Sequence, residues 1–282
     1  PDNPVLTHLT QKGQDNMIQG VGHADIVEAP DGSYWAVALA FRWQTGTHHL
    51  LGRETFLTPV QWEKGKWPTF NGGKNIELKM DCPTLPQVEL PQPASTITFA
   101  PGKELDMRLN FLCNPVERNY SLSARPGYMR MWAGDKTIND AGSPTFLGVR
   151  QTAIDQTCSA TIDGATLKDG ARAGITAYMG KEYHYDIAIV KRDGNCIAQV
   201  TYRLGKMTHV EKEIALDGTA AQLALRGSAH DYHFLLNGKE IARMDARLIS
   251  TETAGGFTGI YFGNFIDGPR GSYIDVKEIS IE

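Results

Sequence analysis

The chain has 282 residues, with 28 Lys and Arg against 32 Asp and Glu, so its formal net charge is −4. This mild acidity, without any basic stripe or run of Lys and Arg, argues against nucleic acid or an anionic membrane as the main partner. No stretch approaches the roughly 20 apolar residues that a membrane-spanning helix needs. The length suits two domains or one large β domain.

Turn signals between apolar runs predict strands along most of the chain. Asp31-Gly32 precedes a continuously apolar run over residues 34–41, which is typical of a strand buried on both faces. Residues 183–189 alternate with period two, so Tyr185 should face one side of a sheet, and His184 and Asp186 the other.

Later turns support the same fold class. Asp193-Gly194 and Asn237-Gly238, like Asp31-Gly32, fit type I′ hairpins, in which both central residues need positive φ. The 29 Gly and 14 Pro interrupt the chain too often for long helices, and helical pattern is confined to short stretches such as residues 219–226. The sequence therefore predicts an all-β protein.

The four cysteines are widely spaced along the chain. They form no CxxC pair and no Cys/His cluster with zinc spacing, and a disulfide scaffold would be denser in so long a chain. We expect free thiols, mostly buried, with one disulfide as the alternative. The residues are Cys82, Cys113, Cys158 and Cys196.

A domain boundary is expected near residues 81–95. Four prolines fall within residues 81–93, and such a segment favours extended structure without a hydrogen-bond ladder. Residues 1–80 hold four of the five tryptophans, and residues 96–282 have the size of a two-sheet sandwich. Because 80 residues of β structure bury only a small hydrophobic core, we expect the first segment to pack against another part of a protein.

Sequence motifs on both sides of this linker resemble glycoside hydrolase family 43, the β-xylosidase and α-L-arabinofuranosidase family. The first segment is similar to the last part of the family's five-bladed propeller, and the second to its C-terminal concanavalin A-like sandwich. The resemblance implies an all-β chain: a partial propeller (1–80, the last blades), the linker (81–95) and a β-sandwich of jelly-roll type (96–282). The motifs are NPVLTH (3–8), GHAD (22–25), DGSYWAV (31–37), HHLLGRETF (48–56), PVQW (59–62), WP (67–68), RPGYMRM (125–131), RQ (150–151), AGI (173–175) and GGFTG (255–259).

The catalytic carboxylates of the family have no counterpart here. The family is an inverting one, with a general base, a general acid and a third carboxylate on earlier blades, and this sequence has neither an Asp-Pro-Ser nor a Glu-Gly-Pro stretch for them. The resemblance therefore implies no catalytic residue in this chain, and Asp25 and Glu54 are expected to be structural. A second chain with the earlier blades, a cleaved polypeptide and a domain that has lost catalysis all fit. Unpaired propeller edges favour an N-terminal propeller chain or segment as partner.

Arg53 is the first substrate-binding candidate. The Arg of the family's Gly-Arg-Glu-Thr motif points into the pocket and holds the sugar at the −1 subsite. A guanidinium suits this role because its donors fork onto two acceptors. The alternative is an ion pair of Arg53 with Glu54 or Asp25 that joins strands.

His23 is the second candidate, because small neighbours leave room for its ring. The matching His of the family lies near the propeller axis and orders a water or a calcium ion, so a calcium site at His23 is one possibility and no cofactor is required. The alternative is a buried core His whose ring nitrogens are hydrogen-bonded to its surroundings. His48 and His49 lack a third ligand at zinc spacing and are expected to be loop residues.

Aromatic residues supply the remaining candidates. In relatives a sandwich loop carries a Phe to the pocket rim, a role that falls to Phe257, and apolar stacking on a sugar face suits an aromatic ring. A core Phe beside a Gly-rich bulge is the alternative. Trp43, just beyond the apolar strand, is the better rim candidate, whereas Trp35 and Trp62 are expected in the propeller core.

A non-catalytic role is the competing hypothesis. The sandwich would then be a carbohydrate-binding or architectural module that also mediates homo-oligomers. Asp275 resembles a calcium ligand of jelly-roll modules, although calcium takes six to eight oxygens. A stripe of exposed aromatics would support sugar binding, and the candidates are Tyr183, Tyr185, Tyr202 and Tyr232.

The expected function is that of part of a glycoside hydrolase. The assembled enzyme would remove terminal xylose or arabinose from xylo- or arabino-oligosaccharides of hemicellulose by single displacement. This chain would contribute Arg53 and His23 to the pocket floor, and Phe257 and Trp43 to its rim.

Overall fold

The computed structural model describes residues 4–9 and 17–282, which fall into two compact units, Pro1–Pro93 and Ala94–Glu282. In this part of the chain the one α-helix is α1 (Thr251–Ala254), and no helix is long and apolar enough to cross a membrane. The prediction of an all-β protein is confirmed. The helical pattern at residues 219–226 was misleading: these residues form strand β15 (Ala220–Gly227), which pairs on both sides.

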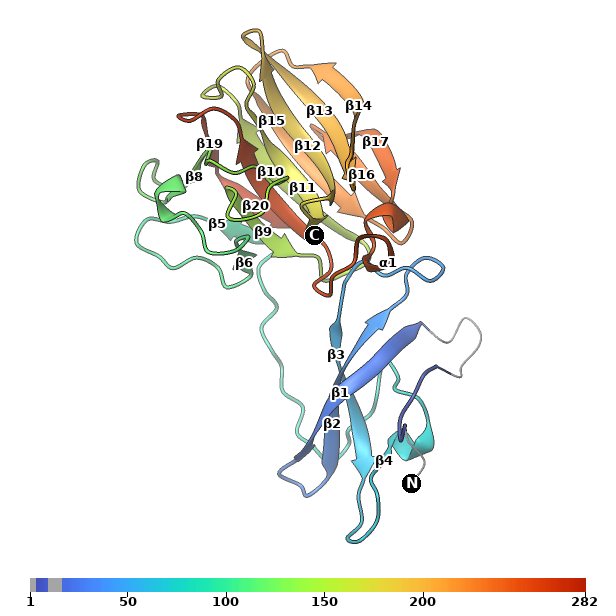
Figure 1. Cartoon of the computed structure of the whole chain (residues 1–282). Coiled ribbons are helices and arrows are strands. Elements are labelled where there is room, and N and C mark those ends of the chain that lie inside the picture. The colour runs from blue at the N-terminus through green and yellow to red at the C-terminus, as the bar shows by residue number, and fades with distance from the viewer. Residues whose placement is uncertain (1–3, 10–16) are drawn as a thin grey trace. The chain divides into compact units, whose positions relative to one another are not determined.

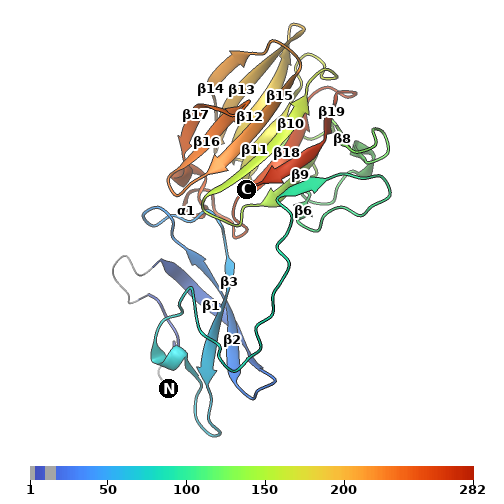
Figure 2. The same cartoon turned by 180° about the vertical axis from the view of Figure 1, so that it is seen from behind.

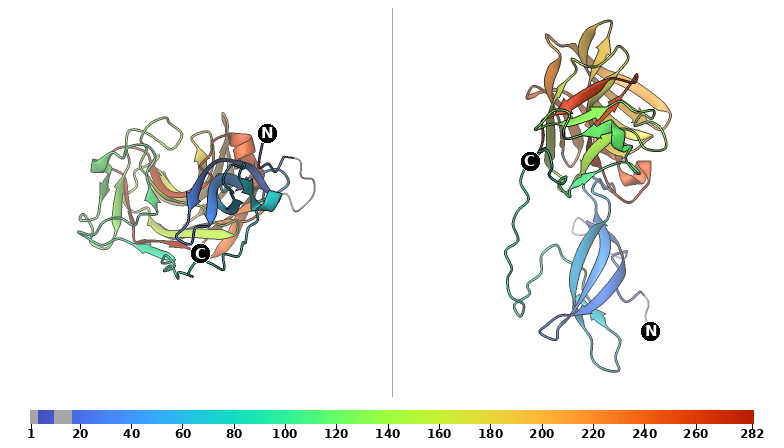
Figure 3. Two further views of the ribbon diagram at one scale, coloured as in Figure 1. Left: turned by 90° about the horizontal axis from the view of Figure 1, so that it is seen from below. Right: turned by 90° about the vertical axis from the view of Figure 1, so that its left-hand side faces the viewer.

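The first unit is built on a four-stranded antiparallel sheet in which each strand pairs with the next (Figure 1). The strands cross one another at an angle, as the twist of β-sheets requires (Figure 3). A four-stranded meander is the form of one propeller blade, and the propeller itself stays a prediction. The strands are β1 (Ile18–Glu28), β2 (Tyr34–Arg42), β3 (Glu54–Gln61) and β4 (Thr69–Phe70), followed by the 3₁₀ turn η1 (Asn71–Gly73).

The two faces of this sheet differ in burial. On one face Ala38, Ala40 and Phe56 are buried against Ile76. On the other face Val37 lies opposite Leu57, and both are exposed. The prediction that the strand over residues 34–41 is buried on both faces is therefore wrong at Val37, because the described residues put a second layer over only one face there.

The second unit is a sandwich of two large antiparallel sheets (Figures 1 and 2). One has the strand order β17-β16-β15-β10-β20-β5, the other β14-β13-β12-β11-β18-β9-β6, and a small sheet has the order β19-β8-β7. Aromatic side chains from both large sheets meet in the core, where Tyr185 contacts Tyr232 and Phe234.

The remaining elements of the second unit follow in chain order. They are β5 (Thr96–Thr98), β6 (Leu109–Asn110), η2 (Glu117–Asn119), β7 (Tyr120–Ser121), β8 (Met129–Trp132), β9 (Phe146–Arg150), β10 (Gln156–Asp163), β11 (Arg172–Gly180), β12 (Tyr183–Arg192), β13 (Asn195–Leu204), β14 (Met207–Ala215), β16 (Asp231–Leu236), β17 (Lys239–Asp245), η3 (Ala246–Ile249), β18 (Tyr261–Asp267), β19 (Tyr273–Val276) and β20 (Glu278–Ile281). Residues 81–95 form neither helix nor strand.

Two of the three predicted hairpin turns have the expected geometry. Asp193-Gly194 has φ values of 50° and 77°, and Asn237-Gly238 has 50° and 79°, as type I′ requires. At Asp31-Gly32 only Gly32 has positive φ, and its N–H donates to the carbonyl of Ala29. Pro30 at the second position of that turn locks φ near −65°, so type I′ is impossible there.

All four cysteines are free thiols, so the alternative of one disulfide is wrong. Cys158 and Cys196 are buried, Cys82 is half-buried and Cys113 is exposed. The prediction that the thiols are mostly buried therefore holds for two of the four cysteines.

Candidate functional site

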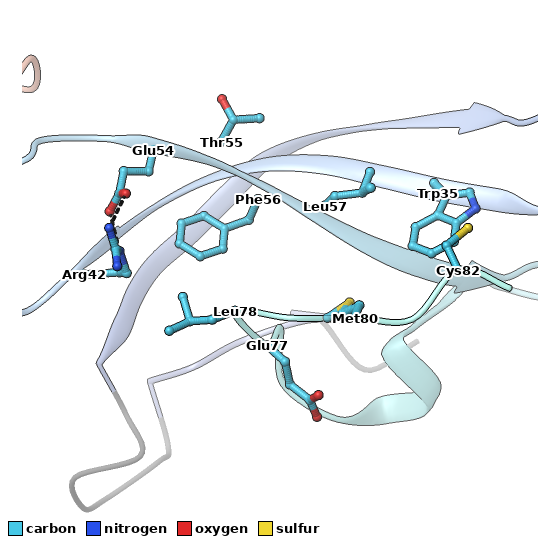
Figure 4. Close-up of a pocket in the computed structure, with 10 residues that line it drawn as sticks. All are labelled: Trp35, Arg42, Glu54, Thr55, Phe56, Leu57, Glu77, Leu78, Met80 and Cys82. Carbon is cyan, nitrogen blue, oxygen red and sulfur yellow. Dashed lines mark hydrogen bonds and ion pairs between the residues drawn. The ribbon is translucent and has the colours of Figure 1, made fainter. Parts of the chain in front are cut away.

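A cavity of about 430 Å³ lies along β3 in the first unit. Residues 77–82 run opposite the strand and form the other wall (Figure 4). The cavity is lined by Trp35, Arg42, Glu54, Thr55, Phe56, Leu57, Glu77, Leu78, Met80 and Cys82.

An ion pair lies at one end of this cavity. Arg42 Nε donates to Glu54 Oε2 at 2.8 Å, and a terminal nitrogen of the same guanidinium donates to Oε1 at 2.7 Å. These hydrogen bonds raise the pKa of Arg42. Glu54 thus joins β2 to β3 through both of its oxygens, which is the structural role expected of it.

His23 lines a second cavity of the first unit, of about 230 Å³. It lies in β1 with a φ of 54°, inside the second of two register shifts that interrupt the pairing with β2, and its side chain is exposed. A bulge of this kind re-aims a side chain. The other lining residues are Pro4, Val5, Leu6, Val21, Gly22, Ala24 and Phe70.

The possible calcium site at His23 stays a prediction. Within residues 4–9 and 17–282, no group of three or more His, Cys, Asp or Glu side chains is placed to hold a metal ion. Calcium takes six to eight oxygen ligands, and an imidazole supplies none. Asn3, the first residue of the NPVLTH motif, lies outside the described residues.

Arg53 and Trp43 lie at one end of the sheet, whereas His23 lies in the middle of β1. Arg53 directly precedes β3 and is exposed, and Trp43 directly follows β2 and is half-buried. The register sets Gly22, Leu39 and Thr55 in one row across three strands. His23 on β1 and Arg53 just before β3 each lie within two residues of this row, and β2 separates them. Trp43 donates its backbone N–H to the carbonyl of Met17.

The other aromatic candidates differ in exposure. Phe257, in the second unit, is 63% exposed and follows two glycines with positive φ, so the alternative of a core Phe is wrong. Trp35 is buried, as expected, and its indole N–H donates to Ser33. Trp62 is 47% exposed, so its assignment to the core is wrong. It begins the loop after β3, where its ring and the ring of Tyr34 are in T-shaped contact.

Comparison with known proteins matches each unit to a family. The family of β-xylosidase C-terminal concanavalin A-like domains matches residues 96–282, and glycosyl hydrolases family 43 matches residues 1–68. The chain belongs to family 43.

Curated relatives of this family 43 chain are longer than the chain itself. It is 32% identical to a non-reducing end α-L-arabinofuranosidase, BoGH43B, of Bacteroides ovatus, and the match covers 95% of this chain and 51% of that protein. It is 30% identical to a xylosidase/arabinosidase of Butyrivibrio fibrisolvens, with 100% and 56% covered. The chain thus spans about half the length of the curated relatives it matches.

Solved structures share the fold of the chain. The GH43B protein of a Bacteroides ovatus xyloglucan locus superposes with a TM-score of 0.92 at 28% identity, over 100% of this chain and 57% of that one. The concanavalin A-like sandwich predicted for the second unit of the family 43 chain is therefore confirmed.

A network of buried charges on the seven-stranded sheet was missed at the sequence level. Arg172 donates to Asp186 at 2.9 Å and to Asp267 at 3.0 Å, each on a neighbouring strand. His184 contacts Asp186 at 2.8 Å and the side-chain oxygen of Asn139 at 3.0 Å. Period-two alternation placed His184 and Asp186 on the face opposite Tyr185, but it carried no sign that a distant loop covers that face.

The two sandwich features proposed for ligand binding have structural roles instead. Both oxygens of Asp275 accept hydrogen bonds from Arg130, at 2.8 and 2.9 Å, and one also accepts from Arg125. Both oxygens of this carboxylate are thus paired with guanidinium groups. Tyr185 and Tyr232 are fully buried between the sheets, so the four tyrosines of the family 43 sandwich do not form an exposed stripe.

Proposed function

We propose that this chain is the C-terminal portion of a glycoside hydrolase that removes terminal xylose or arabinose from hemicellulose oligosaccharides. The observation that carries the proposal is the order of the two family matches, hydrolase first and sandwich second, along one chain. The names of the curated relatives, an arabinofuranosidase and a xylosidase/arabinosidase, supply the substrate class.

In the proposed enzyme Arg53 and His23 belong to the floor of the sugar pocket. Both side chains are exposed on the first-unit sheet, so their polar groups are accessible to a ligand. Arg53 would hold sugar hydroxyls through its forked donors. Trp43 would supply an apolar contact at the rim, and the rim role of Phe257 stays a prediction.

The chemistry of the proposed reaction requires groups from an N-terminal propeller segment. Inverting hydrolysis needs two carboxyl groups about 6.5–9.5 Å apart, one that activates water and one that protonates the leaving group. In this chain Glu54 is occupied by Arg42, and Asp25 is an exposed strand residue opposite Val37. The role of the chain is therefore to bind and orient the sugar and to support the propeller.

An activity assay with an added segment tests this proposal. The 282-residue chain is assayed on aryl β-xyloside and aryl α-L-arabinofuranoside, alone and together with the N-terminal propeller segment of the Bacteroides ovatus relative. We expect no turnover by the chain alone and turnover with the segment. No turnover in either case, or equal turnover without the segment, would contradict the proposal.

Variants of the assembled enzyme test the residue roles. Arg53→Ala should reduce kcat/KM at least 100-fold, and Arg53→Lys nearly as much, because a single ammonium lacks the forked donors. Lys74→Ala, an exposed change directly after η1, is the matched control and should leave kcat/KM within twofold.

A further inference from the structure

Two exposed tryptophans lie at the ends of the loop that joins β3 to β4. Trp67 is 73% exposed and Trp62 is 47% exposed. Leaving two indoles in water forgoes the large gain of burying them, and aromatic rings that stay exposed are enriched at binding surfaces. Arg53 lies at the other end of β3, so the eight-residue strand separates it from Trp62 by roughly 25 Å.

The loop is held in one conformation by its own contacts. The backbone N–H of Lys66 donates to the carbonyl of Glu63, and Gly65 takes the positive φ (81°) that the turn needs. The indole N–H of Trp62 donates to the carbonyl of Lys66 at 3.2 Å. On its other side the Trp62 ring meets the edge of Tyr34 at a centroid distance of 5.7 Å. A ring fixed in this way loses little entropy when a ligand stacks on it.

The loop borders a third cavity of the first unit, of about 560 Å³, which is within the usual size of small-molecule sites. Its walls are mainly apolar, and Lys66, the charged residue of the lining, pairs with Glu63. Both side chains of this pair are largely exposed, so they can reach hydroxyl groups of a ligand. The lining residues are Val5, Trp62, Gly65, Lys66, Trp67, Pro68 and Phe70.

We infer that this loop carries a binding site for a neutral saccharide chain. Flat apolar indole faces suit the C–H faces of sugar rings, the neutralised ion pair favours an uncharged ligand, and polar groups at the rim suit its hydroxyls. The choice of a hemicellulose saccharide rests on the proposed function. Because the site lies far along β3 from Arg53, it would hold a long polymeric substrate and leave small aryl glycosides unaffected.

Binding of a polymer by tryptophan variants tests the inference. Trp67→Ala is the primary variant, because a side chain so exposed contributes little to folding, and Trp62→Ala is the second. Trp132→Ala, which removes a tryptophan from the second unit, is the matched control. Retardation of the 282-residue chain in gels that contain soluble arabinoxylan gives Kd, and calorimetry with xylohexaose gives a second value.

We expect Trp67→Ala and Trp62→Ala each to weaken arabinoxylan binding at least tenfold, and Trp132→Ala to leave it within twofold. Unchanged retardation of Trp67→Ala, or no retardation of the parent chain, would overturn the inference. Retardation that depends on Trp67, without any hydrolysis of aryl glycosides by the assembled enzyme, would uphold the site and refute the proposed function. Hydrolysis by the assembled enzyme, together with retardation that is the same for the parent chain and Trp67→Ala, would support the proposed function and refute the binding site.

Discussion

Arg42 and Glu54 face each other across β2 and β3 and are joined by two hydrogen bonds of 2.7 and 2.8 Å. Both side chains are only 22% exposed. Glu54 directly follows Arg53, so β3 begins with a carboxylate that is paired across the two strands. Arg53 lies just before the strand and is exposed.

Loss of the ion pair should destabilise the first unit. Arg42→Ala leaves a half-buried carboxylate without its two charge-assisted hydrogen bonds, and we expect the free energy of unfolding to fall by about 1–2 kcal/mol. Arg53→Ala removes an exposed side chain and should cost less than about 0.5 kcal/mol. Urea unfolding followed by tryptophan fluorescence measures both. Equal losses for the two variants would show that Arg42 has no special structural role.

Asp186 should make the stability of the sandwich depend on acid pH. Burial by itself raises the pKa of Asp186, but the charges of His184 and Arg172 outweigh burial and lower it to about 2, from 3.8. A carboxyl whose pKa is lower in the folded state than in the unfolded state stabilises the fold at pH values above its unfolded pKa. That contribution, about 2 kcal/mol, should be lost as pH falls from 4 to 2.

Asp186→Asn tests this dependence. The variant should be less stable than the parent chain at pH 6, and the difference should shrink toward pH 2, because only the parent has the carboxyl to protonate. Glu211→Gln, an exposed change on β14, serves as control. A difference between parent and Asp186→Asn that stays constant over pH 6 to 2 would contradict the lowered pKa.

Gly174 should tolerate no side chain. A Cβ there would lie 2.0 Å from the carbonyl oxygen of Ile187 on the adjacent strand, and backbone atoms have no room to yield. Gly174→Ala should therefore lower stability by about 2–3 kcal/mol. Gly180, on the same strand, meets nothing within 4 Å, and Gly180→Ala should have little effect. Comparison of the two Tm values decides the point; a Gly174→Ala variant as stable as Gly180→Ala would show that the strands separate easily.

The four thiols should differ in reactivity. Cys113 is exposed and should react with a disulfide reagent first. Cys158 is fully buried, and burial raises the pKa of its thiol to about 12, so almost no thiolate exists at neutral pH. Mass spectrometry after brief alkylation should find Cys113 modified and Cys158 untouched until the chain is unfolded in urea. Early modification of Cys158 would mean that the sandwich opens readily.

Local sequence was sufficient where one or two residues decide the conformation. Asn237-Gly238 forms the predicted hairpin turn because both residues accept positive φ at low cost. Asp31-Gly32 has a similar composition but follows Pro30, whose fixed φ demands another turn. The alternation over residues 183–189 likewise separated Asp186 from Tyr185 correctly, because side chains on a strand point to opposite faces in turn.

By itself, then, the sequence determined the all-β class, two hairpin turns, the faces of strand residues and the family. The tertiary structure decided which groups meet: Arg42 with Glu54, Arg172 with Asp186 and Asp267, Arg130 with Asp275. These partners come from separate strands, and their pairing depends on register and on loops that cover a face from far along the chain. The exposure of Trp62 has the same cause, because a tryptophan is core or surface according to what packs against it.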